Sequence, residues 1–505
     1  MLQNNFKFSF YVLGISILNL LLFHLPFFKF VINNIDYRTF NGSFLVFSLF
    51  IMTVVANFFA FYMLLFRSGI AGRILICIFF LINAVALYFI NTYGVIIDES
   101  MIGNVLNTNY GESSSFFSFK LLGYIIFLGF VPGYFILTVR TVKESIKKCL
   151  LTLLSSILFI LLFVFANSSS WLWIDKNSKT LGGLVMPWSY TVNTALFYIH
   201  QHQSNEKEIL LPAATMSDNE KAVVVLVIGE SARRENFSLY GYGKKTNPLL
   251  SKIDNVHTFQ ANSCATYTTA GVRCILQHQD TDELYEMLPN YLYRNNVDVV
   301  WRTTNWGEPP VHVKDYQTRE MLLSECKGEN CGYDEVLVSG LKERILLSHT
   351  NKILIVLHTS TSHGPTYSKK YPKQFEAFTP VCNSVELSKC SHQELINAYD
   401  NTIVYTDYIL SRVISELKEL KGYRSSMIYV SDHGESLGEK NLYMHGLPVS
   451  LAPKQQYEIP FIVWSSGGPT IKNDKFVSQN YVFHSVLRFL GVQSPVYNEK
   501  MSIFK

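Results

Sequence analysis

The chain has 505 residues, of which 49% are hydrophobic and only 16% are charged, and its formal net charge is +4. This length allows more than one domain. The chain has no long basic run and no extreme pI, so nothing in it suggests a surface for nucleic acid, and we expect no nucleic-acid partner. Charged residues are scarce in the first third of the chain and ordinary in number afterwards, which predicts a membrane-embedded part followed by a soluble part.

Apolar runs fill the first third of the chain. Each is long enough to cross the hydrocarbon core of a bilayer as a helix, which takes about 20 residues. Buried helices of a soluble core rarely stay apolar all round over such a length. The runs are 8–31, 44–66, 74–97, 121–139 and 149–167. We therefore predict a five-helix transmembrane domain over residues 1–167.

Basic residues predict the orientation of these spans. They lie before the first span, between the second and third, and between the fourth and fifth: Lys7, Arg67, Arg73, Arg140, Lys143, Lys147 and Lys148. The loop 98–120 has three acidic residues and a single lysine, at its end. By the positive-inside rule the N-terminus is cytoplasmic. Five spans then place everything after about residue 168 in the periplasm of a bacterial inner-membrane protein.

Six of the eight cysteines lie in the soluble part and form three pairs close in sequence. An even set of local pairs is typical of disulfides in an oxidising compartment such as the periplasm. Zinc ligation by cysteines is the alternative, but the spacings are not those of Cys-x-x-Cys pairs. The expected disulfides are Cys264 with Cys274, Cys326 with Cys331, and Cys382 with Cys390.

Residues 168–220 predict amphipathic connecting helices near the membrane surface and then a linker. Residues 221–505 predict a globular α/β sandwich, because three β-branched and aliphatic runs alternate with helical patterns. The runs are `VVVLVIGE`, `ILIVLHTSTSHGP` and `MIYVSDHGE`. Ligands bind at the carboxyl ends of strands in such sheets.

Polar residues follow each of these runs. Alone, Glu230 or Asp432 could simply cap a helix, and His358 is more simply a packed histidine. Together with His433 they would converge on one point, where unpaired buried charges are costly and a divalent cation offsets the cost. A mixed oxygen and nitrogen donor set favours zinc over magnesium, with manganese as an alternative. Further donors would come from His363 and His445.

The segment `NSCATYTTAGVRCIL` offers hydroxyl groups between two cysteines ten residues apart. A hydroxyl bound to a metal is partly deprotonated and can act as a nucleophile. The alternative is a polar turn that a disulfide stabilises. Composition does not distinguish Thr266, Thr268 and Thr269.

The ordered motifs of the chain resemble those of membrane phosphoethanolamine transferases, the family that modifies lipid A and includes the colistin-resistance enzymes. With the five-span start, the resemblance covers nearly the whole chain. The matching segments are `GESARRENFSLYGYGKKTNPLL` (229–250), `SCATYTTAGVRC` (263–274), `HTSTSHGPTY` (358–367), `YDNTIVYTD` (399–407) and `SDHGESLGEKNLYMHG` (431–446). It implies an alkaline-phosphatase-like, or sulfatase-like, catalytic domain over residues 221–505.

The resemblance also implies roles for individual residues. Thr268 would be the nucleophile, because it stands four residues after Cys264, as the family's threonine does. His363 and His445 would bind the substrate phosphate or a second zinc. The implied ligands of the catalytic zinc are Glu230, Thr268, Asp432 and His433. The residues expected near the donor headgroup are Asn104, Thr108 and Glu112. They share one helical face, which could also simply be a solvated face.

The implied reaction is zinc-dependent transfer of phosphoethanolamine from phosphatidylethanolamine to lipid A or another surface acceptor, through a phosphothreonine intermediate, by a monomer that contributes to polymyxin resistance. The alternatives are phosphoglycerol transfer by the same architecture and an inactive membrane scaffold. A sulfatase would need a Cys-x-Pro-x-Arg element, which the sequence lacks. The chain departs from the family at Ala265 and Arg273, and acceptor contacts around `WRTTNWGEPP` are not assigned.

Overall fold

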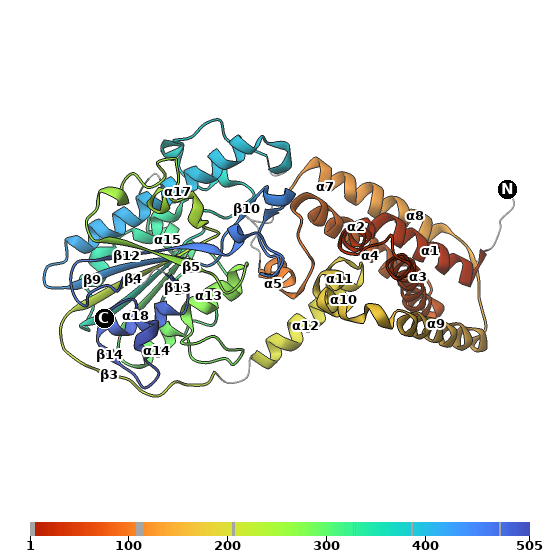
Figure 1. Cartoon of the computed structure of the whole chain (residues 1–505), viewed down its shortest axis with the longest axis horizontal. Helices are drawn as coiled ribbons and strands as arrows, with labels where there is room; N and C mark the ends of the chain where they lie inside the picture. The colour runs from red at the N-terminus through yellow and green to blue at the C-terminus, as the bar shows by residue number, and fades with distance from the viewer. Residues whose placement is uncertain are drawn as a thin grey trace. The chain divides into compact units, whose positions relative to one another are not determined.

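The computed structural model describes residues 6–107, 116–204, 208–326, 328, 330–384, 387–473 and 476–505. The chain divides into two compact units (Figure 1). The membrane unit comprises Met1–Ile102 and Phe117–Tyr198, and the sheet unit comprises Gly103–Phe116 and Ile199–Lys505.

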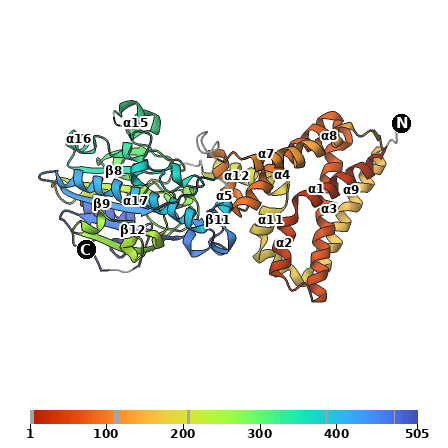
Figure 2. The ribbon, with the colours of Figure 1, turned by 90° about the horizontal axis from the view of Figure 1, so that it is seen from above.

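Four described helical segments of the membrane unit are long and apolar enough to cross a bilayer. They are α3 (Phe40–Ser68), α4 (Ile70–Tyr93), the segment Phe119–Thr138 and α9 (Ile146–Ala166). The third segment consists of α7 (Phe119–Tyr124), a π-helical turn (Ile125–Phe130) and α8 (Val131–Thr138). Helices α3 and α9 run side by side (Figure 2). Each segment overlaps one of the predicted runs.

The first predicted span is bent. Helix α1 (Phe8–Phe23) meets α2 (Leu25–Asn34) at 63°, and the pair makes a fifth span only if it is counted as one. Pro26 lies in the first turn of α2. Proline lacks the N–H group that would continue a helix, so a helix can begin at this residue but does not run through it unbroken. The described residues therefore contain four or five spans.

The shorter helices are α5 (Glu99–Asn107), α10 (Trp171–Lys176), α11 (Ser178–Leu184) and α12 (Trp188–Ser204), of which α5 and α12 cross the boundary between the two units. Helix α12 is joined to the spans by polar contacts. Tyr190 donates to Asn83 Oδ1 at 3.0 Å, and Trp188 donates to Asn57 Oδ1 at 3.0 Å. Asn83 in turn donates to Asn19 Oδ1 at 2.8 Å. Such polar pairs hold helices together where no water is present to satisfy the groups.

The described residues of the sheet unit form an eight-stranded sheet in the order β13-β5-β12-β9-β4-β8-β6-β7. The strands from β9 to β7 in this order are parallel, whereas β12 is antiparallel to both its neighbours. The strand bounds are β4 (Ala222–Gly229), β5 (Val256–Asn262), β6 (Asp298–Thr303), β7 (Asp315–Gln317), β8 (Lys352–His358), β9 (Arg424–Ser431), β12 (Glu458–Ser465) and β13 (Phe476–Ser478).

The three predicted runs are the central strands β4, β8 and β9. Every residue of β4 and β8 is buried, as expected for strands that are covered on both faces. Helices α13 (Thr268–Leu276), α14 (Leu288–Arg294) and α18 (Tyr481–Leu490) pack on one side, and α17 (His392–Lys418) covers the other (Figure 1). Besides short 3-10 helices, the sheet unit also has α15 (Arg319–Glu325), α16 (Leu341–Leu346), and the small pairs β3 (Thr215–Met216) with β14 (Val492–Gln493) and β10 (Ser436–Leu437) with β11 (Tyr443–Met444).

The cysteines pair as expected. The disulfides are Cys264 with Cys274, Cys326 with Cys331, and Cys382 with Cys390. Cys77 and Cys149, which belong to the membrane unit, are free thiols. The first disulfide joins the loop before α13 to the helix itself and so restrains the segment that carries Thr268.

Candidate active site

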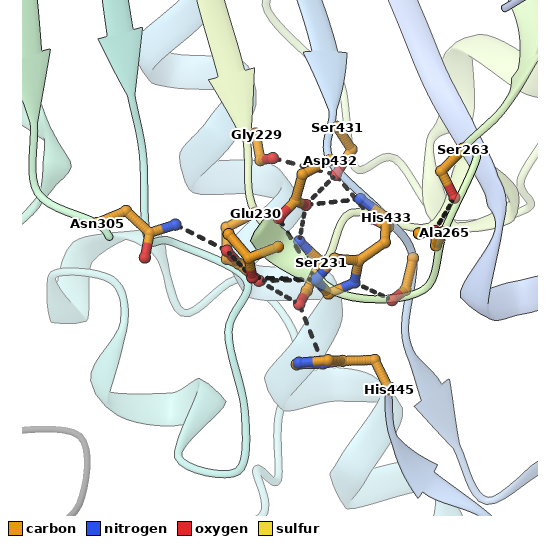
Figure 3. Close-up of polar contacts among 12 residues, drawn as sticks. Gly229, Glu230, Ser231, Ser263, Ala265, Asn305, Ser431, Asp432, His433 and His445 are labelled. Atoms are coloured by element: carbon orange, nitrogen blue, oxygen red, sulfur yellow. Dashed lines mark hydrogen bonds and ion pairs between the residues drawn. The ribbon is translucent and has the colours of Figure 1, made fainter. Parts of the chain in front are cut away.

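Polar side chains gather at the carboxyl ends of the adjacent parallel strands β9, β4, β8 and β6 (Figure 3). Glu230 directly follows β4, and Asp432 and His433 directly follow β9. Asn305 lies two residues beyond the end of β6. Because parallel strands end at one edge of a sheet, residues from distant parts of the chain meet there.

Glu230 is buried and held by neutral donors. Ser231 Oγ donates to Glu230 Oε1 at 2.7 Å, and Asn305 Nδ2 donates to Oε2 at 2.7 Å. Ser231 has a left-handed backbone, with φ of 53°, which is unusual for a residue with a side chain. Its N–H donates to Asp432 Oδ1 at 3.0 Å, so the strained turn links the carboxylates of β4 and β9.

The tautomer of His433 follows from its hydrogen bonds. The Nδ1 atom lies 2.8 Å from the carbonyl oxygen of Gly434 and must donate to it. In the neutral ring, Nε2 therefore carries the lone pair. This nitrogen lies 3.4 Å from Glu230 Oε1 and 3.4 Å from Asp432 Oδ2. In that form of the ring, an electron pair without a proton faces two carboxylate oxygens.

Thr268 completes this group. It is buried at the first position of α13, and its hydroxyl lies 3.3 Å from Glu230 Oε2 and 3.3 Å from His433 Nε2. Gly271 in the same helix lets this end of α13 approach the backbone of Asp432, because an added Cβ would lie 2.3 Å from the carbonyl oxygen of Asp432. The Thr266 hydroxyl instead donates to the carbonyl oxygen of Leu447 at 2.5 Å. The structure therefore brings Thr268, and not Thr266, to the carboxylates.

These separations fit a bound cation. Donor atoms about 2.0–2.2 Å from a tetrahedral ion lie about 3.3–3.6 Å from one another. Four of the six pairs formed by Thr268, Glu230, Asp432 and His433 have separations of 3.3, 3.3, 3.4 and 3.4 Å, with Oε2 of Glu230 near Thr268 and Oε1 near His433. Asp432 Oδ2 is buried and accepts no hydrogen bond from any residue that the structure describes. Glu230, His433 and His445 also form a buried set whose donor atoms all lie within 4.8 Å of one another. The site can therefore hold a metal ion.

The electrostatics of the carboxylates lead to the same conclusion. Burial and the neighbouring charge of Glu230 raise the pKa of Asp432 well above its usual range. Burial alone would raise the pKa of Glu230 too, but three nearby imidazoles, His433 first among them, hold it well below its usual value. The two carboxylates therefore compete for one negative charge. A divalent cation would allow both to ionise.

His363 and His445 line the same site. The ring centroids of His445 and His433 are 4.2 Å apart, and those of His363 and His445 are 5.4 Å apart. His445 Nδ1 lies 3.2 Å from Glu435 Oε1. Burial raises the pKa of Glu435 to about 8. His363, His445 and Glu435 thus add further donor atoms next to those of Glu230 and His433.

The predicted headgroup residues lie only partly within the described residues. Asn104 is a half-buried residue of α5. Thr108 and Glu112 lie outside the described residues. The Nδ1 atom of His358 faces other groups, at 3.4 Å from Glu308 Oε2 and 3.3 Å from the hydroxyl of Thr303.

Two supporting contacts were not predicted from the sequence. Asn305 joins Glu230 to the carbonyl oxygen of Thr359, at 2.9 Å. Tyr399 on α17 donates to the carbonyl oxygen of Ser231 at 2.7 Å and accepts from the N–H of Arg233 at 2.8 Å. The `YDNTIVYTD` motif was available as a signal for Tyr399, whereas no motif pointed to Asn305.

The chain is similar to known families and proteins along most of its length. The profile described as Sulfatase matches residues 222–492, and the profile described as Phosphoethanolamine transferase EptA/EptB matches residues 54–202. The chain is 43% identical over 449 residues to phosphoethanolamine transferase EptA of Helicobacter pylori, covering 85% of this chain and 84% of that protein. It is 31% identical over 458 residues to phosphatidylethanolamine transferase Mcr-1 of Escherichia coli, covering 84% of each.

A solved structure matches the whole chain. It is that of the integral membrane protein lipooligosaccharide phosphoethanolamine transferase A from Neisseria meningitidis, with a TM-score of 0.88 and 26% sequence identity. The match covers 99% of both chains, so the likeness includes the spans and the sheet unit alike.

Proposed function

The chain belongs to the family of EptA phosphoethanolamine transferases, and we propose that it transfers phosphoethanolamine from phosphatidylethanolamine to lipid A, or to another surface acceptor, through a phosphothreonine intermediate on Thr268. One observation carries the assignment of the nucleophile. The Thr268 hydroxyl lies 3.3 Å from both Glu230 Oε2 and His433 Nε2, at the end of the sheet where the donor group gathers.

Zinc is the proposed ion of this donor group. Two carboxylates, an imidazole nitrogen and a hydroxyl form a set that suits zinc, whereas magnesium prefers oxygen donors and bound water. Glu230, Thr268, Asp432 and His433 would hold it. His363 and His445 would bind the substrate phosphate or a second zinc. When bound, zinc would promote loss of the hydroxyl proton and stabilise negative charge that develops on the phosphoryl oxygens.

The proposed reaction then has two displacement steps at the phosphorus atom. Thr268 Oγ1 attacks the phosphorus of the donor, the phosphorus–oxygen bond to diacylglycerol breaks, and diacylglycerol leaves with the proton that the hydroxyl gave up. An acceptor oxygen next attacks the same phosphorus and releases Thr268. Glu230 accepts the hydrogen bond of the Thr268 hydroxyl, which orients the attacking oxygen, and Asn305 and Ser231 fix Glu230.

The proposed topology places the N-terminus in the cytoplasm and the catalytic domain in the periplasm of a bacterial inner membrane. Residues 1–167 would form five spans, 168–220 the connecting segment, and 221–505 the catalytic domain of a monomer. Asn104, Thr108 and Glu112 would lie near the donor headgroup. Cationic ethanolamine lowers the negative charge of the modified surface, so it weakens the attraction of cationic peptides such as polymyxin.

Mass spectrometry of lipid A tests this proposal. Cells that express the chain should carry phosphoethanolamine on lipid A, and cells that express Thr268→Ala should not. Thr269→Ala is the matched control, because Thr269 is the next residue of the same helix and should leave the modification intact. If lipid A is unmodified and another surface molecule carries phosphoethanolamine, that molecule is the acceptor. Phosphoglycerol on the acceptor, or modification that persists in Thr268→Ala, would contradict the proposal.

A further inference from the structure

The membrane unit contains a cavity of about 540 Å³ that is separate from the candidate active site. Its walls come from four elements: α1, the end of α3, the start of α4 and the segment that leads into α9. Apolar side chains and cations line it together. Among the cations are Arg67, Arg73 and Lys143.

Two of these cations have no partner within the described part of the chain. Arg67 and Lys143 are exposed at the cavity and make no hydrogen bond or ion pair with another described residue. A positive-inside signal requires charge in a short loop, but it does not require a cavity around that charge. The two cations therefore favour the binding of an anion, which the described residues do not supply.

The third cation belongs to the scaffold of the cavity. Arg73 donates to the carbonyl oxygen of Val139 at 2.5 Å and to the Thr141 hydroxyl at 3.2 Å, and its guanidinium lies 4.9 Å from the ring centroid of Tyr11. These contacts join the start of α4 to the end of α8 and to α1. The cavity wall is thus built from fixed groups, with Arg67 and Lys143 at its free positions.

The one acidic residue of the lining is already satisfied. Glu144 Oε1 accepts from Ser9 Oγ at 2.6 Å and from Lys148 Nζ at 2.5 Å, and Oε2 accepts from the Tyr62 hydroxyl at 2.6 Å. Burial opposes ionisation of Glu144, but these donors outweigh it and lower its pKa to about 2. A zwitterionic headgroup would also need an acceptor for its ammonium group. Glu144 has little capacity left for one, so the lining favours an anion over a zwitterion.

We propose that this cavity binds the phosphate of an anionic phospholipid headgroup, with Arg67 and Lys143 as its ion-pair partners. The apolar residues of the lining, among them Phe8, Leu65 and Ile146, would contact the beginning of the acyl chains. A phosphodiester readily accepts hydrogen bonds from guanidinium and ammonium groups. Electrostatic attraction to an anionic lipid also stabilises a cation near the bilayer surface. The lipid would be a bound structural partner, distinct from the zwitterionic donor of the proposed reaction.

Native mass spectrometry of the full chain in detergent, titrated with phosphatidylglycerol, measures this binding. Arg67→Gln combined with Lys143→Gln should weaken it about 30-fold, on the scale of two cations beside an anionic headgroup. Lys7→Gln combined with Lys147→Gln is the matched control, because it removes two exposed lysines that do not line the cavity. The control should change the affinity by less than about threefold.

A steric variant separates the cavity from general surface charge. Ile146→Trp keeps every charge but fills the cavity. We expect it to weaken the binding of phosphatidylglycerol at least about tenfold, whereas Ile146→Val should not weaken it to this extent. This pair also decides the question if the double charge variant fails to fold. Equal weakening in both double variants, or an unaffected Ile146→Trp, would overturn the proposal. Equally tight binding of phosphatidylcholine would also overturn it. So would displacement of the lipid by an equal concentration of sn-glycerol 3-phosphate, because that would indicate a soluble phosphate ligand.

Discussion

Gly271→Ala tests whether the close approach of α13 to the end of β9 positions Thr268. The added Cβ would lie 2.3 Å from the carbonyl oxygen of Asp432, whereas ordinary contact needs roughly 3.5 Å. Both partners are main-chain segments, so no side chain can rotate away, and they must separate by about 1 Å. Alanine favours a helix by about 1 kcal/mol over glycine, and overpacking costs about 1–3 kcal/mol. The net loss of stability should therefore be at most about 2 kcal/mol.

Activity should fall much further than stability. Thr268 begins the helix that must move, and a misplacement of about 1 Å can lower a rate about 100-fold. The assay is the rate of phosphoethanolamine transfer by the purified full chain, together with its thermal unfolding. Gly243→Ala is the control, because its added Cβ meets no atom within 4 Å. A Gly271→Ala protein that transfers at the wild-type rate would refute this reasoning.

Three further predictions concern other parts of the chain. Burial raises the pKa of Asp407 to about 6, so the folded chain keeps a proton that the unfolded chain loses above about pH 4. Wild type should therefore lose about 3 kcal/mol of stability relative to Asp407→Asn as pH rises from about 4 to about 6, and no more above it. If the melting temperatures of wild type and Asp407→Asn do not diverge over this pH range, this prediction is wrong. Thiol labelling of the denatured, non-reduced protein should modify only Cys77 and Cys149, and labelling of any other cysteine would contradict the disulfides. The predicted headgroup residues are Asn104, Thr108 and Glu112. Alanine at each of them should lower transfer but leave the zinc content unchanged. If all three variants behave like wild type, the segment is only a connector.

Much of the sheet and part of the donor group could be predicted because both follow from local patterns. Continuous β-branched runs identified β4, β8 and β9, and the polar residues after them could be expected to meet because the strands are parallel. The local spacing of the cysteines likewise indicated their pairs. These inferences needed no knowledge of how distant segments pack.

Other features depend on long-range packing. In an extended loop Thr266 and Thr268 would share a face, but Thr268 begins a helix, and Thr266 turns to Leu447 instead. The contact of Asn305 with Glu230 depends on β6 lying beside β8, an order of strands that no motif encodes. The bend in the first predicted span had a local signal, because Pro26 lies within it.

The central claim is that Thr268 carries the phosphoethanolamine group between donor and acceptor. Its most direct test is peptide mass spectrometry of the full chain after incubation with phosphatidylethanolamine in the absence of acceptor. We predict a phosphoethanolamine adduct on Thr268 and none in Thr268→Ala, which should also lack transfer while remaining folded. An adduct on Thr266 or Thr269, or full transfer by Thr268→Ala, would contradict the account.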